Sequence, residues 1–445
     1  MQTRRDHVQA YQFAMARLST ALVTGDSGRG EPPARRSRLG MFFGAGLAAL
    51  LCAGFGVFGL ISPGGNTSWR QPHTVIVEKE TGNRYLYLGG ELRPVRNYAS
   101  ALLIAGEGAT VRTVSRNSLA GVPHGTPVGI PNAPDTLPSA TQLLLGAWTR
   151  CVRDDPPNGL LLDFHPAGRI RPFPADRQVV LSSTSGDLYL LWHGTKYPLP
   201  DDASRIALGL DTQQQLVAPR SWLSAVPTGA RLVPASVPGV GRPGRTVGGR
   251  PARIGQVFTA MAGTGGHSYV LRADGLEPVS ATEGALLSTR RGAPAPRRVD
   301  QSYIAAAPVS KDHALMKAVP DVLGARQQPL TTEALCLREQ TTSGVMHTQV
   351  VLEGGQAAIG KRFVLVPPGR GVVALDNSDT ANLGTPQRYL ITEQGRLYPI
   401  GRGNSALYLG LPQMGGLPLP RDVLGLLPKG PELDAAAALA TVRGG

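Results

Sequence analysis

The stretch Tyr85-Leu-Tyr-Leu-Gly-Gly-Glu-Leu-Arg-Pro94-Val95 decides the fold, because the chain contains three further copies of its pattern. The other copies run from a tyrosine to a proline in the segments 189–198, 269–278 and 389–399. In each copy a short alternating strand precedes a glycine turn, a second short strand and a proline that ends the pairing. The pattern predicts a mainly-β body built from hairpins.

A second signature, apolar-Pro-x-Gly-x-x-apolar, also occurs four times, in the segments 122–128, 226–232, 366–372 and 427–433. The two signatures are 29 residues apart in three cases, measured from Pro94 to Pro123, Pro198 to Pro227 and Pro399 to Pro428. From Pro278 to Pro367 the interval is 89 residues. We therefore expect four repeat modules, the third of which carries an insertion of about 60 residues.

Residues 39–61 form a run of 23 residues without a charge, directly after Arg35, Arg36 and Arg38. About 20 helical residues cross a bilayer, whereas the apolar core of a cleaved signal peptide is only about 7–15 residues long. The run therefore predicts a retained transmembrane helix. Because basic residues precede it, the positive-inside rule predicts a cytoplasmic N-terminus and an exported body from about residue 62.

The composition limits what the exported body binds. The chain has 56 glycines, 38 prolines and 5% aromatic residues, which favours short strands and tight turns. The net charge of the chain is +14. The residues after 38 carry +10 of it, since they contain 38 Lys/Arg and 28 Asp/Glu. Outside a membrane this balance suits acidic headgroups or wall polymers better than nucleic acid.

Two of the three cysteines, Cys151 and Cys336, follow the apolar run, and Cys52 lies inside it. An exported pair with no other candidate is most simply one disulfide. Cys151 lies between the first two repeats, and Cys336 lies in the insertion. The pair therefore predicts that these two segments form one central β-rich domain.

Near the N-terminus, five apolar residues are spaced three, four, three and four apart, which predicts one stripe on an amphipathic helix: Val8, Tyr11, Met15, Leu18 and Leu22. A helix of this length cannot bury such a stripe alone. It either docks on a partner or lies on the inner leaflet. The narrow stripe and the weakly basic polar face favour docking.

Motifs for catalysis are weak. Gly355, Gly360 and Lys361 come close to a phosphate-binding loop, but Arg362 replaces the hydroxyl residue that would hold magnesium. The segment 239–244 matches a dinucleotide fingerprint only in its glycines and lies in the loop 238–253, which we interpret as a linker. The eight histidines are isolated, so we expect neither a metal site nor catalytic residues nor a bound cofactor.

These patterns predict a single-pass membrane protein with an elongated mainly-β body. We expect a cytoplasmic amphipathic helix and linker in 1–38, a transmembrane helix in 39–61, repeat 1 in 62–130, the first segment of the central domain in 131–177, repeat 2 in 178–240, a linker and the first segment of repeat 3 in 241–290, the second segment of the central domain in 291–361, the second segment of repeat 3 in 362–376, repeat 4 in 377–435 and a tail in 436–445.

Three stretches resemble the EccB family of the type VII (ESX) secretion system. They are Arg4-Arg-Asp-His-Val-Gln-Ala-Tyr-Gln-Phe13, Val77-Glu-Lys-Glu-Thr-Gly82 and Ser115-Arg-Asn-Ser-Leu-Ala-Gly-Val-Pro123. The resemblance implies a core subunit in the inner membrane with its bulk in the periplasm and a disulfide between its two exported cysteines. The partners that it implies are EccC, EccD, EccE, the mycosin protease and further copies of this chain.

Two other functions stay open. The family carries an ATPase label, so a nucleotide hydrolase using ATP is one alternative, although the loop at Gly355 gives it no support. A sensor of wall polymers is the other, and it depends only on the positive charge.

Overall fold

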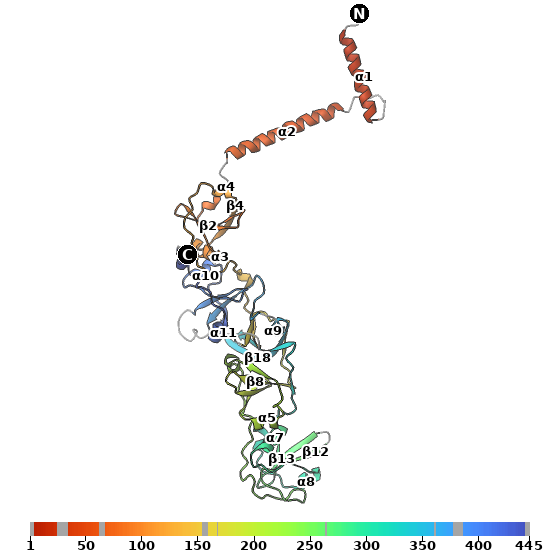
Figure 1. The fold of residues 1–445 in the computed structure, drawn as a ribbon, viewed down its shortest axis with the longest axis vertical. Coiled ribbons are helices and arrows are strands. Elements are labelled where there is room, and N and C mark those ends of the chain that lie inside the picture. The colour runs from red at the N-terminus through yellow and green to blue at the C-terminus, as the bar shows by residue number, and fades with distance from the viewer. Residues whose placement is uncertain are drawn as a thin grey trace. The chain divides into compact units, whose positions relative to one another are not determined.

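The computed structural model describes residues 4–24, 34–61, 67–153, 159–166, 168–262, 265–359, 362–376 and 386–440. It divides into two compact units. The first comprises Met1–Arg70, Glu78–Thr81 and Thr113–Val122, and the second comprises the rest of the chain. Figure 1 shows the order of the elements.

The first unit contains two long helices, α1 (Arg4–Thr24) and α2 (Ala34–Ile61). Helix α2 begins five residues before the predicted span, inside the segment that we assigned to the linker, because nothing in 34–38 breaks a helix. Its stretch Leu39–Val57 is long and apolar enough to cross a membrane, and none of this stretch is buried within the chain. The predicted linker residues 25–33 lie outside the described residues.

The residues after α2 form five sheets, and four of these sheets share one strand order. The orders are β3-β2-β1-β4, β10-β9-β8-β11, β14-β13-β12-β15 and β22-β21-β20-β23. In chain order their strands are β1 (Thr74–Glu78), β2 (Arg84–Leu88), β3 (Glu91–Pro94), β4 (Thr110–Val114), β8 (Arg177–Ser183), β9 (Leu188–Trp192), β10 (Thr195–Leu199), β11 (Gln215–Ala218), β12 (Val257–Ala262), β13 (Gly265–Leu271), β14 (Leu276–Val279), β15 (Arg297–Arg298), β20 (Val372–Asp376), β21 (Arg388–Ile391), β22 (Leu397–Pro399) and β23 (Leu417–Leu419).

Each of these sheets extends the predicted hairpin by a helix and a fourth strand. The helices are α3 (Tyr98–Ala105), α5 (Asp202–Ala207), α7 (Ala281–Thr289) and α10 (Ser405–Tyr408). The first three begin at an N-cap side chain, of Asn97, Asp201 and Ser280, that accepts a backbone N–H. The fourth strand pairs in parallel in the second, third and fourth of these sheets, as a crossover through a helix requires.

The same two backbone hydrogen bonds close all four sheets. The N–H of Leu92 donates to the carbonyl of Pro123 (2.8 Å), and the N–H of Gly125 donates back to the carbonyl of Leu92 (3.0 Å). Equivalent pairs join Lys196 to Pro227 and Gly229, Leu276 to Pro308 and Ser310, and Leu397 to Pro428 and Gly430. This contact explains the second sequence signature.

The prediction for the third module was wrong. Its closing turn is at Pro308, 30 residues after Pro278, and lacks the signature glycine because Ser310 stands there. The turn at Pro367 instead precedes β20, the first strand of the fourth sheet, so 362–376 do not complete the third one. Likewise β15 lies within the predicted insertion 291–361 but pairs with β12.

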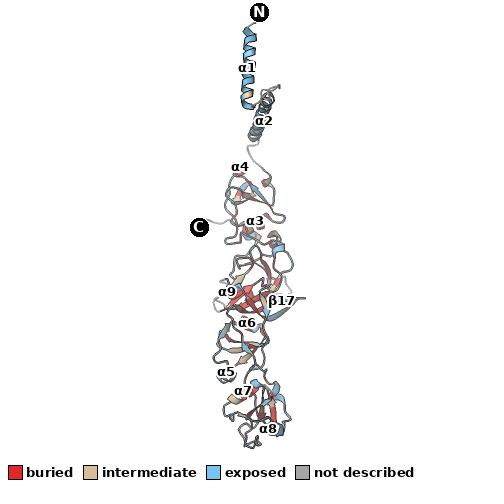
Figure 2. Ribbon diagram, turned by 90° about the vertical axis from the view of Figure 1, so that its right-hand side faces the viewer, coloured by how far each residue is buried: buried red, intermediate tan, exposed pale blue. Residues whose placement is uncertain are grey.

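A six-stranded sheet of order β19-β6-β5-β17-β18-β7 joins the two segments that carry the cysteines. Its strands are β5 (Trp148–Val152), β6 (Leu160–Asp163), β7 (Ile170–Pro172), β17 (Glu333–Thr342), β18 (Val345–Gly354) and β19 (Val364–Leu365). Figure 2 shows that buried residues gather around β17. Buried side chains of this sheet share one core with the β10-β9-β8-β11 sheet and the residues that follow it, through Val179 and Trp222, and another with the β22-β21-β20-β23 sheet, through Ile391 and Leu419.

The loop 238–253 is not a linker. Its two arms form isolated bridges between Pro243 and Arg253 and between Val247 and Arg250. Val247 and Ala252 are buried in one cluster with Phe258 of β12. The loop is thus a hairpin that packs on the sheet of β12.

The remaining elements are short. They are η1 (Ser68–Arg70), α4 (Arg116–Leu119), η2 (Ala140–Gln142), α6 (Arg220–Ser224), α8 (Gln301–Ala306), η3 (Ala314–Lys317), β16 (Arg326–Gln327), α9 (Gln356–Ile359), α11 (Arg421–Leu426) and α12 (Ala435–Leu439).

Candidate functional site

The disulfide predicted from the cysteine count lies at the centre of the six-stranded sheet. Cys151 of β5 and Cys336 of β17 face each other directly in the antiparallel pairing, and the structure joins them. Both residues are fully buried. The bond closes a sequence separation of 185 residues.

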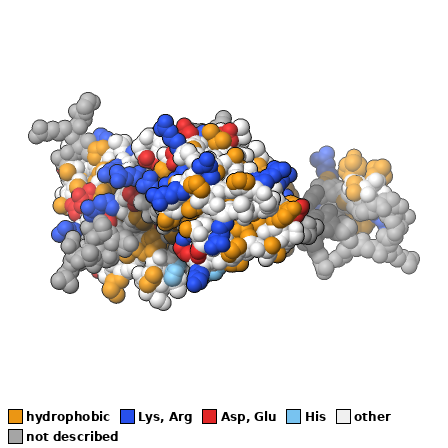
Figure 3. All heavy atoms as spheres, turned by 90° about the horizontal axis from the view of Figure 1, so that it is seen from below, with side chains coloured by type: hydrophobic (Ala, Val, Ile, Leu, Met, Phe, Trp, Pro, Cys, Tyr) orange, Lys and Arg blue, Asp and Glu red, His pale blue; other side chains and the backbone are white. Residues whose placement is uncertain are grey.

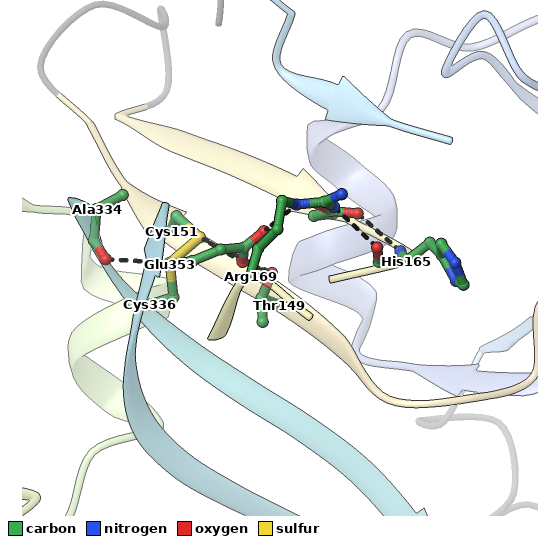
Figure 4. Close-up of polar contacts among 8 residues, drawn as sticks. Thr149, Cys151, His165, Arg169, Ala334, Cys336 and Glu353 are labelled. Carbon is green, nitrogen blue, oxygen red and sulfur yellow. Dashed lines mark hydrogen bonds and ion pairs between the residues drawn. A yellow bond between two sulfur atoms is a disulfide. The ribbon is translucent and has the colours of Figure 1, made fainter. Parts of the chain in front are cut away.

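A buried carboxyl group lies beside this disulfide (Figure 4). Strand β18 places Glu353 opposite Ala334, close in register to the cysteine pair. Its Oε2 lies 3.4 Å from Cys151 Sγ and accepts a hydrogen bond of 2.5 Å from the Thr149 hydroxyl. Glu353 is fully buried, and a charged carboxylate there would lack the solvation that water gives it.

A second acid and one arginine complete the cluster. Asp163, at the end of β6, accepts a hydrogen bond of 2.5 Å from Arg169 Nη2 and another of 2.7 Å from the His165 backbone N–H. Arg169 Nε is 3.9 Å from Glu353 Oε1. One cation therefore faces two buried carboxyl groups, which leaves the cluster one positive charge short.

A bound proton makes up this deficit. Burial, followed by the hydrogen bond and charge of Asp163, raises the pKa of Glu353 to about 8. Glu353 is therefore a neutral acid at pH 7. Cys151, Cys336 and Glu353 also present ligand-type atoms within 4.8 Å of one another. Cysteine binds a metal as a thiolate. Because the two sulfurs are bonded to each other, this set does not fit a metal while the disulfide is intact.

The raised pKa of Glu353 predicts a pH-dependent stability. The folded state holds the proton more tightly than the unfolded chain, so the stabilisation is complete below pH 4.5 and is lost as the pH rises through about 8. Between these values we expect Glu353 to lower the free energy of unfolding by about 1.4 kcal/mol per pH unit. The free energy of unfolding, measured by urea unfolding at several pH values from 5 to 8, should therefore fall less steeply with pH for Glu353→Gln than for wild type.

Glu333→Gln is the matched control, because Glu333 lies on the neighbouring strand but pairs with Arg171 at the surface. In this variant the free energy of unfolding should change with pH as it does in wild type. If it also changed with pH in the same way in Glu353→Gln, Glu353 would be ionised in the folded protein at pH 7.

A second buried cluster surrounds Arg150. Its Nη2 lies 2.5 Å from Glu339 Oε1, and both side chains are almost fully buried. Its Nη1 donates to the carbonyl of Ser221 (3.2 Å) in α6 and lies 3.5 Å from Asp422 of α11. Arg150 thus connects the central sheet to helices α6 and α11.

The sequence analysis did not identify Glu353 or Arg150, although the residues around each of them give a weak indication of burial. Each is a charged residue inside an apolar strand, in Val350-Val-Leu-Glu353 and Trp148-Thr-Arg-Cys-Val152. Their partners lie about 70 to 270 residues away in the chain, so only the fold brings them together.

Of the other site residues proposed from the sequence, the structure describes Gly355 and the stripe on α1. Gly355 lies between β18 and α9, and α9 is a single helical turn of four residues. Gly360 and Lys361 lie outside the described residues. The stripe on α1 is exposed, from 52% for Met15 to 81% for Leu22.

These features define a class of protein: one apolar helix near the N-terminus, followed by a mainly-β body of several sheets with a central disulfide. The chain belongs to the EccB family, described as "Type VII secretion system ESX-1, transport TM domain B", whose model matches residues 1–444. The resemblance seen in the sequence is confirmed, and with it a structural role in type VII secretion.

Similar proteins come from several secretion systems. The chain is 26% identical to the ESX-3 secretion system ATPase EccB3 of Mycolicibacterium smegmatis, over 98% of this chain and 90% of that one. It is 27% identical to the ESX-5 secretion system ATPase EccB5 of Mycobacterium marinum, over 98% and 92%.

Solved structures share the fold. A chain of the intact ESX-5 inner membrane complex matches with a TM-score of 0.56 at 24% identity, covering 100% of this chain and 96% of that one. A chain of the EccB3 dimer from the ESX-3 core complex matches with a TM-score of 0.54 at 25% identity, covering 82% and 99%.

Proposed function

We propose that this chain is an assembly subunit of a type VII secretion complex in the inner membrane. Helix α2 spans the membrane once, α1 lies in the cytoplasm, and the β-rich body lies in the periplasm. The exposed stripe on α1 carries this proposal, because five apolar side chains at helical spacing are uncovered within the chain. A helix with such a stripe gains stability only by packing on something else.

We propose that the four sheets of equal strand order are copies of one repeat module around the central sheet. The shared order and the shared closing bonds support this assignment. The predicted domain limits are kept as proposals, with two changes. The third module includes the hairpin 238–253 and extends through the turn at Pro308, and the fourth module begins at β20.

The partners follow from the family. We propose EccC, EccD, EccE and the mycosin protease as neighbours in the complex, with the stripe on α1 docking on a cytoplasmic or membrane partner. The solved EccB3 dimer supports association between copies of this chain.

Charge on the stripe should prevent docking. In the double variant Tyr11→Glu and Leu18→Glu, two carboxylates would have to be buried in an apolar interface, at a cost of several kcal/mol. We expect the chain to enter the membrane but to lose its partners when the complex is purified from detergent-solubilised membranes through a tag on this chain.

Gln9→Glu is the control, because Gln9 is exposed on α1 outside the stripe, and it should assemble as wild type does. Full assembly of the double variant would refute docking through this stripe.

Nucleotide hydrolysis is a second candidate, since the similar proteins are named ATPases. Arg362 at the position of the magnesium-binding hydroxyl argues against it. We expect wild type and Lys361→Ala to release phosphate from ATP at the same trace rate. A rate of phosphate release that falls in Lys361→Ala would support a hydrolase function.

A further inference from the structure

The third module contains a concavity of about 720 Å³ that no predicted motif accounts for. Three arginines line it: Arg250 from the hairpin 238–253, and Arg297 and Arg298 from β15. Figure 3 shows the body from the end where α8, β12 and β13 lie in Figure 1, with Lys and Arg side chains gathered on that face.

A two-glycine turn brings Arg250 to this concavity. The backbones of Val247 and Arg250 bond to each other in both directions, and Gly248 and Gly249 between them have φ of 63° and 70°. Residues other than glycine are strained in that conformation. At Gly248 a Cβ would also lie 3.4 Å from the Tyr303 ring, which packs against the turn.

Arg297 fixes the hairpin to the sheet. Its Nη2 donates to the Val247 carbonyl, and its guanidinium lies over the Phe258 ring, 4.8 Å from the centroid. Its Nε is buried without a hydrogen-bond partner among the described residues. A buried donor without a partner is destabilising and marks a place where an acceptor is missing.

The positive charge in the concavity is not balanced. Within the part of the chain that the structure describes, none of the three arginines forms an ion pair with a carboxylate. Burial and the nearby charge of Arg250 lower the pKa of Arg297. Asp300 is the one acid in the lining, so the site retains an excess of two positive charges.

The rest of the lining suits a ring that bears hydroxyl groups. The side chains of Tyr303 and Met261 are 46% and 63% exposed and offer an apolar surface. Thr259 and Gln301 lie beside them with groups that donate and accept hydrogen bonds. The volume is within the range of small-molecule sites.

We propose that this concavity binds an anionic saccharide, a sugar ring that carries a phosphate or a carboxylate. Arg250 and Arg298 hold the anionic group through charge-assisted hydrogen bonds, the pairing that guanidinium groups favour. Tyr303 contacts the ring. The site is separate from the stripe on α1 and does not depend on the proposed assembly role.

Calorimetric titration of the full chain in detergent tests this site, with glucose 6-phosphate, inorganic phosphate and glucose as probes at one fixed salt concentration. We expect glucose 6-phosphate to bind more tightly than inorganic phosphate, and glucose to give no measurable binding. Arg250→Gln and Arg298→Gln should each weaken glucose 6-phosphate binding about tenfold, as the loss of one charge-assisted hydrogen bond implies.

Arg245→Gln is the control, because Arg245 is exposed on the same hairpin but does not line the concavity, and it should bind as wild type does. Equal weakening in all three variants would mean a diffuse charge effect and would overturn the proposal. Binding of inorganic phosphate as tight as that of glucose 6-phosphate would overturn the saccharide assignment. Unchanged thermal unfolding of the variants would show that a loss of binding is not a loss of fold.

Discussion

Replacement of Cys151 and Cys336 by alanine is expected to lower the free energy of unfolding by about 5 kcal/mol, the largest effect of any change proposed here. The disulfide ties strands β5 and β17 across 185 residues of sequence. In the chain-entropy model such a long closed loop restricts the unfolded chain strongly, so that its loss favours unfolding.

Chemical unfolding of the full chain in detergent measures this effect. Cys52→Ala is the control, since Cys52 forms no disulfide, and it should unfold as wild type does. If the double variant unfolded at the wild-type denaturant concentration, the bond would not be what holds the two segments together.

Arg150→Met is expected to cost about 3–5 kcal/mol. The variant leaves Glu339 fully buried without its cation, and burial already raises the pKa of that carboxyl. It also removes the hydrogen bond to Ser221 and the contact with Asp422. Since these two residues lie in α6 and α11, the loss should loosen both the second and the fourth module from the central sheet.

A second substitution separates two effects of Arg150→Met: the loss of the ion pair with Glu339, and the burial of the Glu339 carboxylate without a cation. Arg150→Met combined with Glu339→Leu should recover most of the stability, because an apolar pair often replaces a buried ion pair at little cost. Arg326→Met, which removes the exposed partner of Asp176, should change stability by less than about 1 kcal/mol. A similar small loss for Arg150→Met would mean that Arg150 does not connect the modules.

Much of the fold follows from local sequence, because hairpins and their turns are local structures. The copies at Tyr85, Tyr189, Tyr269 and Tyr389 each lie in the second strand of one of the four sheets that share a strand order. The helix and fourth strand that complete each sheet were not predicted, since fourth strands such as β15, with two residues, are too short for a periodic pattern.

The third module shows how a motif can mislead. Its closing turn keeps the proline but has Ser310 where the other three turns have glycine. Glycine is needed at the other turns because a Cβ would meet a side chain, as at Gly430, where Tyr398 would be 2.3 Å away. In the third module a Cβ is excluded in the facing turn instead, just before β14, since at Gly275 it would lie 2.3 Å from the Pro308 carbonyl oxygen.

The disulfide followed from counting cysteines, but the polar clusters did not. Glu353 and Arg150 acquire their properties from strands that are distant in sequence, and no local pattern reports burial of that kind. The hairpin 238–253 resembled a linker because its glycines and prolines also suit flexible segments. Only its contacts with β12 show that it belongs to the third module.

The most direct test of the account is the position of the two ends of the chain relative to the membrane. Val23→Cys on α1 and Met414→Cys in the fourth module place a thiol at positions that are 86% and 88% exposed. When intact spheroplasts are treated with a membrane-impermeant maleimide, we expect Met414→Cys to be labelled and Val23→Cys to be labelled only after lysis. Labelling of Val23→Cys alone in intact spheroplasts would contradict the proposed topology, and with it the role of this chain as a membrane-spanning assembly subunit.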